Sequence, residues 1–219
     1  MPLLQIALDL WEEREALELA RRLAPCADIL EVGTTLLLAC GLRIVQRLRD
    51  LVGDRVLLFV DAKIVDAGEE EAEAVFQHGA DIVSVLGGAS RPTLEGVWKA
   101  ARRWGRRWMV DTIDLPLGSL EKMALLKELQ PDFVGLHLPH DVVREEERAW
   151  QNVEFSSFPW QDFPLLVAGG ITPRTLPRIL ALFHPEVVVV GSAITRSSYP
   201  EEVARTMRRM LDECSGESC

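Results

Sequence analysis

Short apolar runs alternate with longer amphipathic, charge-rich segments eight times along this chain of 219 residues. The runs begin about every 26 residues, which is the length of one strand plus a crossover helix and its two loops. Some of them, such as the four valines at 187–190, are apolar throughout, as expected for strands of a parallel sheet that is covered on both faces. The predicted strands occupy residues 4–9, 27–33, 55–63, 80–87, 107–113, 131–138, 163–170 and 185–194.

The segments between these runs have the spacing of amphipathic helices, most clearly at 11–23, 69–78, 172–183 and 200–211. In the second of these helices, Ala72, Val75 and Phe76 fall on one face and most of the carboxylates fall on the other. The third opens on Thr172-Pro173, which predicts a helix start with Thr172 as the N-cap and proline in the first turn.

Eight such units without an interrupting linker predict a single (β/α)8 barrel over residues 1–213, followed by a short flexible tail at 214–219. A doubly wound open sheet is the architectural alternative, because the number of units does not show whether the sheet closes. The four cysteines are expected to be free thiols rather than a disulfide framework, since the chain is neither short nor visibly secreted.

The charge balance excludes some classes of partner. The chain has 24 Lys and Arg against 34 Asp and Glu, a formal net charge of −10, which argues against nucleic-acid binding because that requires clustered cations. No apolar run reaches the roughly 18 residues of a membrane-spanning helix. The first residues lack the basic and apolar regions of a signal peptide, so a cytoplasmic protein is expected.

Polar residues end most of the predicted strands. In a barrel of this kind the carboxyl ends of the strands surround one mouth, where the active site lies. One charged residue in such a place is often a turn or a cap, but a converging series is costly unless the protein uses it. The strand-end residues are Asp9, Glu31, Asp61, Lys63, Asp111, His137, Gly169, Gly170, Gly191 and Ser192.

Strand alternation places Asp61 and Lys63 on the same face of the third strand. An ordinary ion pair is one interpretation of these two residues. In a second interpretation, Asp61 and Glu31 together hold Mg²⁺, which favours one or two carboxylates completed by water and substrate oxygens.

The glycines at the ends of the last two strands predict a phosphate site. Glycine lets backbone N–H groups approach an anion closely, and barrels commonly bind phosphate at these two loops. His137 lies at the same rim and could act as an acid or a base near neutral pH.

Four segments together resemble a known group of enzymes. They are 4–9 (Leu-Gln-Ile-Ala-Leu-Asp), 31–34 (Glu-Val-Gly-Thr), 61–68 (Asp-Ala-Lys-Ile-Val-Asp-Ala-Gly) and 80–87 (Ala-Asp-Ile-Val-Ser-Val-Leu-Gly). They are similar to those of the 3-hexulose-6-phosphate synthases and the 3-keto-L-gulonate-6-phosphate decarboxylases, two groups of the orotidine-5′-monophosphate decarboxylase suprafamily. The resemblance extends from Leu4 to about Met210.

The resemblance implies a homodimer of (β/α)8 barrels with shared active sites. It implies a Mg²⁺ ion bound by Glu31 and Asp61, and a Lys63 that contacts the substrate and its enediolate. It further implies that Asp66 reaches into the partner's site and that Asp9 contacts substrate hydroxyls or Lys63. The backbone of Gly170, Gly191 and Ser192 would then hold the phosphate.

The reaction that the synthases carry out joins formaldehyde to D-ribulose 5-phosphate through a 1,2-enediolate. Asp111 and Ala168 favour the synthases, because the decarboxylases tend to carry Glu and Thr at these positions. His137 matches a histidine of the group that can transfer protons, which makes it the candidate base.

Other features leave alternatives open. The segment 138–141 departs from both groups, so a decarboxylase or a divergent member that acts on another sugar phosphate remains an alternative. A sugar-phosphate binder without activity on the same scaffold is a third hypothesis. The segment 143–160 is longer than a usual connection and is interpreted as a lid, a subunit contact or a surface loop.

Overall fold

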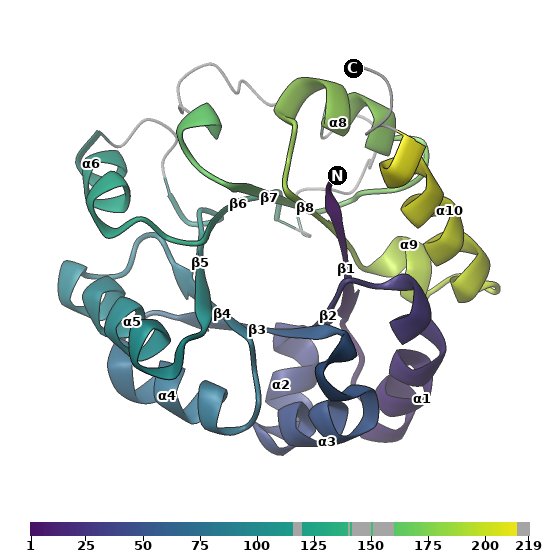
Figure 1. Ribbon diagram of the computed structural model, residues 1–219, viewed down its shortest axis with the longest axis horizontal. Helices are drawn as coiled ribbons and strands as arrows, with labels where there is room; N and C mark the ends of the chain where they lie inside the picture. Colours follow the sequence, from purple (N-terminus) through teal and green to yellow (C-terminus); the bar gives the residue numbers. More distant parts are fainter. Residues whose placement is uncertain (116–119, 140, 142–149, 151–159, 214–219) are drawn as a thin grey trace.

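The eight strands form a closed, all-parallel barrel in the order β1 to β8, with β8 paired back onto β1. The computed structural model describes residues 1–115, 120–139, 141, 150 and 160–213. Helices surround the ring of strands (Figure 1). The predicted (β/α)8 barrel is therefore confirmed, and the open sheet is excluded. The predicted tail at 214–219, with its two cysteines, lies outside the described residues.

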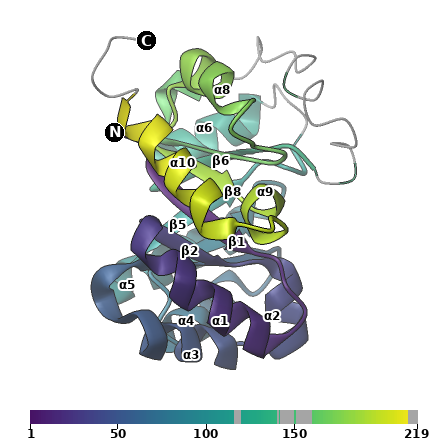
Figure 2. The same cartoon turned by 90° about the vertical axis from the view of Figure 1, so that its right-hand side faces the viewer.

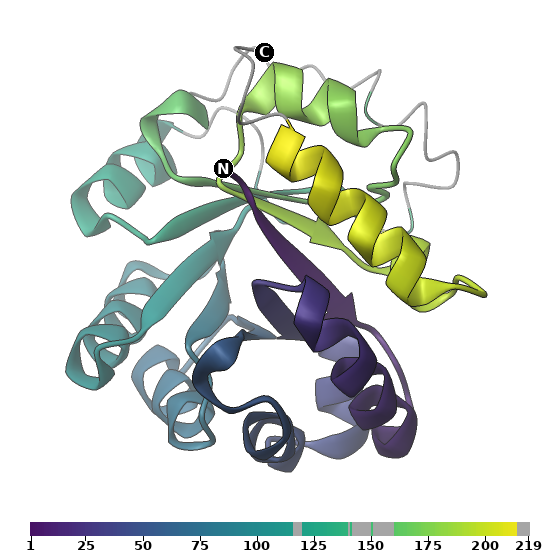
Figure 3. The same ribbon diagram turned by 45° about the vertical axis from the view of Figure 1, so that its right-hand side comes forward.

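The strands lie close to their predicted positions: β1 Leu3–Leu8, β2 Ile29–Val32, β3 Leu57–Ile64, β4 Ile82–Leu86, β5 Arg107–Asp111, β6 Phe133–His137, β7 Leu165–Ala168 and β8 Val187–Val190. The α-helices are α1 Glu13–Leu23, α2 Thr34–Cys40, α3 Arg43–Val52, α4 Gly68–Gln77, α5 Arg91–Trp104, α6 Leu120–Leu129, α8 Leu176–Phe183, α9 Ser192–Thr195 and α10 Pro200–Glu213. Helix α10 runs beside α1 and across β1, where the ring closes (Figures 2 and 3).

Two predicted boundaries are wrong. The eighth strand ends at Val190 rather than at 194, because Gly191 (φ −104°, ψ −100°) leaves the extended conformation and α9 follows. The helix predicted from Thr172 begins only at Leu176. The Thr172 N–H donates to Thr175 Oγ1 at 2.9 Å, and this local bond stabilises a turn where the first helical turn was expected.

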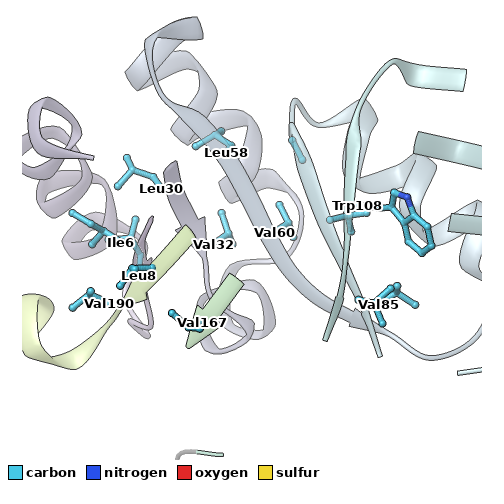
Figure 4. Close-up of a cluster of buried hydrophobic side chains, with 14 of the residues drawn as sticks. Ile6, Leu8, Leu30, Val32, Leu58, Val60, Val85, Trp108, Val167 and Val190 are labelled. Atoms are coloured by element: carbon cyan, nitrogen blue, oxygen red, sulfur yellow. The ribbon is translucent and has the colours of Figure 1, made fainter. Parts of the chain in front are cut away.

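Alternate residues along each strand pack into two separate layers. One layer lies between strands and helices and includes Ile6, Val32, Val60 and Trp108 (Figure 4). The other fills the inside of the barrel with apolar side chains, namely Ala7, Ile29, Phe59, Ile82, Met109, Phe133, Leu166, Ala168, Val187 and Val189.

The inward-facing positions change from apolar to polar toward the carboxyl ends of the strands. Two residues after Ile29 comes Glu31, and two residues after Phe59 comes Asp61. Both carboxylates are buried. Because strand side chains repeat with a period of two, β2 and β3 each place an apolar residue inside the barrel and a carboxylate at the mouth.

At the opposite end of the barrel, an aspartate precedes three of the four even-numbered strands. Asp28, Asp81 and Asp132 stand directly before β2, β4 and β6. They accept the backbone N–H groups of Leu4, Leu58 and Trp108 at 2.7, 2.8 and 3.0 Å, respectively. Each carboxylate thereby ties the start of a neighbouring strand to the barrel.

Asp81→Ala is expected to destabilise the fold by about 2–3 kcal/mol, because the carboxylate also pairs with Arg49 and Arg106 and its side chain is only 13% exposed. Thermal unfolding should show a lower Tm than for the parent. Asp54→Ala is the matched control, since Asp54 is fully exposed and lies 3.8 Å from Arg49. Equal losses in both variants would contradict this role of Asp81.

Two further predictions can be compared with the described residues. Among these residues, none of the helices has both the length and the apolar character required to cross a bilayer. Cys26 and Cys40 are free thiols, as expected.

Candidate active site

A cavity of about 550 Å³ lies at the carboxyl ends of the strands. It brings together the residues that were predicted from the strand ends. Its lining includes Asp9, Glu31, Asp61, Lys63, Asp111, His137, Gly169, Gly170, Gly191 and Ser192.

Lys63 lies between two carboxylates. Its Nζ is 2.8 Å from Asp61 Oδ2 and 2.9 Å from Asp111 Oδ2, so the predicted pair with Asp61 is present. Burial opposes the charged form of the amine, but Asp61 and Asp111 outweigh it and raise the pKa of Lys63. The ammonium group therefore stays charged at neutral pH.

The backbone at Lys63 is left-handed, with φ +47°. It lies in an irregular stretch of β3, where the pairing with β4 shifts between Val60 and Ile64. The Lys63 N–H donates to Ser84 Oγ at 2.9 Å. A strained backbone of this kind persists only where surrounding contacts hold it in place. At Lys63 this backbone conformation directs the side chain into the cavity lining.

Ser84 was missed in the sequence. It is fully buried in β4, and its Oγ donates to Asp61 Oδ1 at 2.8 Å. Thr34 Oγ1 donates to Asp61 Oδ2 at 2.9 Å from the start of α2. The sequence feature that could have identified Ser84 is a single hydroxyl residue at an inward position of an otherwise apolar strand.

Asp111 connects Lys63 to His137. It is fully buried, and its Oδ2 lies 3.0 Å from Nδ1 of His137. Burial pushes the pKa of Asp111 upward, but the hydrogen bonds and charges of His137 and Lys63 prevail and hold it below its usual value. Since an ionised carboxylate only accepts, Nδ1 carries the proton in the neutral imidazole, and Nε2 is then the basic ring atom.

Glu31 is buried next to other carboxylates. Burial, followed by the charges of Asp61 and Asp9, raises the pKa of Glu31 well above its usual range. Gln5 Nε2 donates to Glu31 Oε2 at 2.6 Å. The Asp9 carboxylate packs against Gly33, and a Cβ at position 33 would overlap this carboxylate. The acids thus form an electronegative wall of the cavity.

This wall suits a hard divalent cation. Within the described part of the chain, no three or more His, Cys, Asp or Glu side chains group as a metal site. Mg²⁺, however, usually needs only one or two carboxylates, with water and substrate oxygens completing its shell. Glu31 and Asp61 line the same cavity and repel each other, so their donor set fits this ion.

The glycine turns that follow β7 and β8 also line the cavity, and Gly191 lies beside Asp9. Gly169 and Gly170 have φ values of +101° and +61°, and a Cβ at Gly169 would overlap the carbonyl of Leu138. Only glycine fits this turn. No helix follows this turn directly, because α8 begins several residues later.

Two residues near these turns were not predicted. Trp150 Nε1 donates to the Gly169 carbonyl at 2.9 Å, and its ring packs edge-on against Phe183. Arg196, directly after α9, adds a cation to the cavity lining. Nothing in the local sequence distinguishes Arg196 from other surface arginines.

Some predicted residues lie elsewhere. Asp66 is exposed between β3 and α4 and is not part of the cavity lining of its own chain. Its Oδ1 accepts the N–H of Ala67 at 2.9 Å. His140 lies outside the described residues, as does the segment 143–160 apart from Trp150 and Trp160.

The sequence pattern of the Orotidine 5'-phosphate decarboxylase / HUMPS family matches residues 2–207. The chain belongs to this family.

Relatives within the family are similar over almost their whole length. The chain is 33% identical to 3-hexulose-6-phosphate synthase 2 of Staphylococcus saprophyticus over 210 residues, which are 95% of this chain and 97% of that protein. The crystal structure of 3-hexulose-6-phosphate synthase from Salmonella typhimurium superimposes with a TM-score of 0.83 at 30% identity, and the match covers 96% and 99% of the two chains.

The crystal structure of 3-keto-L-gulonate-6-phosphate decarboxylase from Vibrio cholerae has a TM-score of 0.79 at 22% identity, and the match covers 97% of this chain and 98% of that one. At this identity the likeness shows the shared barrel fold alone.

Proposed function

We propose that this family member is a Mg²⁺-dependent aldehyde-lyase of the 3-hexulose-6-phosphate synthase type, which joins formaldehyde to D-ribulose 5-phosphate. The main support is the position of Lys63 between Asp61 and Asp111 in a cavity that acids and glycine turns line together. The synthase names of relatives at 30–33% identity support the same assignment.

In this proposal the backbone of Gly170, Gly191 and Ser192 binds the phosphate of the sugar, and Asp9 accepts a hydrogen bond from a sugar hydroxyl. These contacts hold the ketose carbonyl next to Lys63. Fixing the substrate at its distant end makes the later proton transfer effectively intramolecular.

His137 Nε2 takes a proton from the carbon next to the ketose carbonyl, and Asp111 stabilises the imidazolium that forms. The electron pair of the broken C–H bond moves toward the carbonyl oxygen, which the Lys63 ammonium stabilises. The same carbon then bonds to formaldehyde as the ketose carbonyl re-forms. The C=O electron pair of formaldehyde moves to its oxygen, which takes up the proton that His137 holds and becomes the new hydroxyl group.

Glu31 and Asp61 would hold Mg²⁺ in this site. When bound, the ion supplies Lewis-acid stabilisation of negative charge on the ketose oxygens. Asp61 already pairs with Lys63, so the same carboxylate would orient the ammonium and the metal toward one substrate.

The proposal predicts that ribulose 5-phosphate is consumed only when formaldehyde is present. EDTA is expected to stop the reaction and added Mg²⁺ to restore it, which a coupled assay of hexulose 6-phosphate formation measures. Activity that persists in excess chelator would remove the metal from the proposal.

Two other outcomes assign a different function. CO₂ release from 3-keto-L-gulonate 6-phosphate, without any formaldehyde reaction, would identify a decarboxylase. Phosphate-dependent thermal stabilisation without turnover of either substrate would identify a sugar-phosphate binder.

We further propose that the chain works as a homodimer in which Asp66 serves the partner's cavity, since it lies outside that of its own chain. Asp66→Ala and Lys63→Ala are each expected to be inactive. Because a heterodimer of the two has one intact site, a random equal mixture should recover about a quarter of the parental activity. No recovery in verified heterodimers would contradict a shared site.

A further inference from the structure

Gln5 is a buried amide inside the barrel that the proposed chemistry does not use. It stands in the apolar strand Leu-Leu-Gln-Ile-Ala-Leu, is 1% exposed, and pairs in register with Ile29 and Val189. Its side chain nevertheless lines the cavity. Leucine or valine would fill such a position without a polar group, so the amide requires an explanation.

One half of this amide has a clear partner. Nε2 donates to Glu31 Oε2 at 2.6 Å. Nε2 is the donor of this contact, so Oε1 is the end of the amide that does not face Glu31. Gln5 therefore holds Glu31 in one orientation at the acidic wall.

The other half of the amide has no partner among the described residues. Oε1 of Gln5 is buried, and none of their donors reaches it. A buried acceptor without a donor is costly, and in native proteins such an atom is normally satisfied by a bound group. Since Gln5 lines the cavity, a ligand in the cavity can supply the donor.

We propose that Gln5 is a positioning residue of this site, whose Nε2 orients Glu31 and whose Oε1 accepts a hydrogen bond from an O–H group of the bound ligand. This inference rests on the proposed function. Two sources share the required chemistry: a water molecule on the divalent cation, which Mg²⁺ retains in most sites, and a hydroxyl of the sugar phosphate.

The test compares Gln5→Leu with the parent and with Gln46→Leu. Leucine keeps the approximate size of the side chain and removes both polar atoms. Gln46 also donates to a carboxylate, that of Asp50 at 2.9 Å, but it lies exposed on α3 away from the cavity. Calorimetry measures the affinity for Mg²⁺ alone in one arm and for ribulose 5-phosphate in EDTA in the other.

Gln5→Leu is expected to bind about tenfold more weakly in one arm, which identifies the donor as a cation-bound water or a sugar hydroxyl. The ligand-induced rise in Tm should shrink in the same arm, whereas Gln46→Leu behaves like the parent. A purely structural Gln5 would shift the Tm equally with and without ligand.

Parental affinity of Gln5→Leu in both arms would overturn the inference. A parent that binds both ligands but does not consume formaldehyde would overturn the proposed function alone, because the affinity comparison remains valid. A parent that binds neither ligand would overturn both.

Discussion

Lys63→Ala is expected to lower kcat/KM for the condensation by about 10³-fold, the upper range for loss of one charge-stabilising donor in a water-poor site. Its ammonium contacts both Asp61 and Asp111, and under the proposed function it carries the charge that opposes the developing oxyanion. The measurement is a steady-state assay with ribulose 5-phosphate and formaldehyde.

The Lys63→Ala variant is expected to lose turnover but to keep phosphate binding. The proposed phosphate site consists of backbone groups of the glycine turns and does not include Lys63. Inorganic phosphate should therefore still stabilise Lys63→Ala against heat. Lys99→Ala is the matched control, since Lys99 lies exposed on α5 outside the cavity lining. Parental turnover in Lys63→Ala would reduce Lys63 to a structural ion-pair partner.

Glu31→Gln is expected to lower the proposed Mg²⁺-stimulated turnover by about 10²-fold or more, because an amide replaces one of the two proposed anionic ligands. In the metal-free protein the same change should raise the Tm at pH 7–8. It removes a buried charge that burial, Asp61 and Asp9 disfavour, and it keeps an acceptor for Gln5.

The pH dependence follows from the direction of the Glu31 shift. The pKa of Glu31 is higher in the folded than in the unfolded state, so the folded state holds this proton to higher pH. Stability is therefore lost as the pH rises from the unfolded value, about 4.3, to the raised value. The advantage of Glu31→Gln should be absent near pH 4 and grow as the pH rises from about 4.3 toward the raised pKa of Glu31.

Thermal unfolding in EDTA between pH 4 and pH 8 measures this difference. Glu70→Gln, an exposed change on α4, removes the same charge without relief of burial and should leave the Tm nearly unchanged. A lower Tm for Glu31→Gln at pH 8 would show that the Glu31 carboxylate stabilises the apoprotein instead.

The periodic features of the sequence predicted the barrel and the location of the cavity. A strand that is apolar on both sides and ends in Asp61 or Glu31 has few alternatives once eight such units repeat. The helix start at Thr172 failed for a local reason, because two threonines close a turn before the helix begins. The helix propensity of these residues does not show whether the first helical turn or the threonine-closed turn is the more stable.

The supporting residues of the site were harder to predict. Ser84, Thr34 and Gln5 act through contacts that join residues more than 20 positions apart, and each is common in ordinary strands and helices. The left-handed backbone of Lys63 depends on the pairing shift between β3 and β4, which no single strand encodes. Such features emerge only when the strands are assembled.

The apolar side chains that fill the inside of the barrel, here called the plug, determine where a reactant can enter the cavity. Phe59, Met109 and Leu166 belong to this plug and also form part of the cavity lining. Under the proposed function, a sugar phosphate would therefore enter and leave at the mouth, because in the described part of the chain these side chains fill the barrel below it. Under the proposed chemistry, formaldehyde must arrive through the same opening, and a released hexulose phosphate would compete with the next ketose for it.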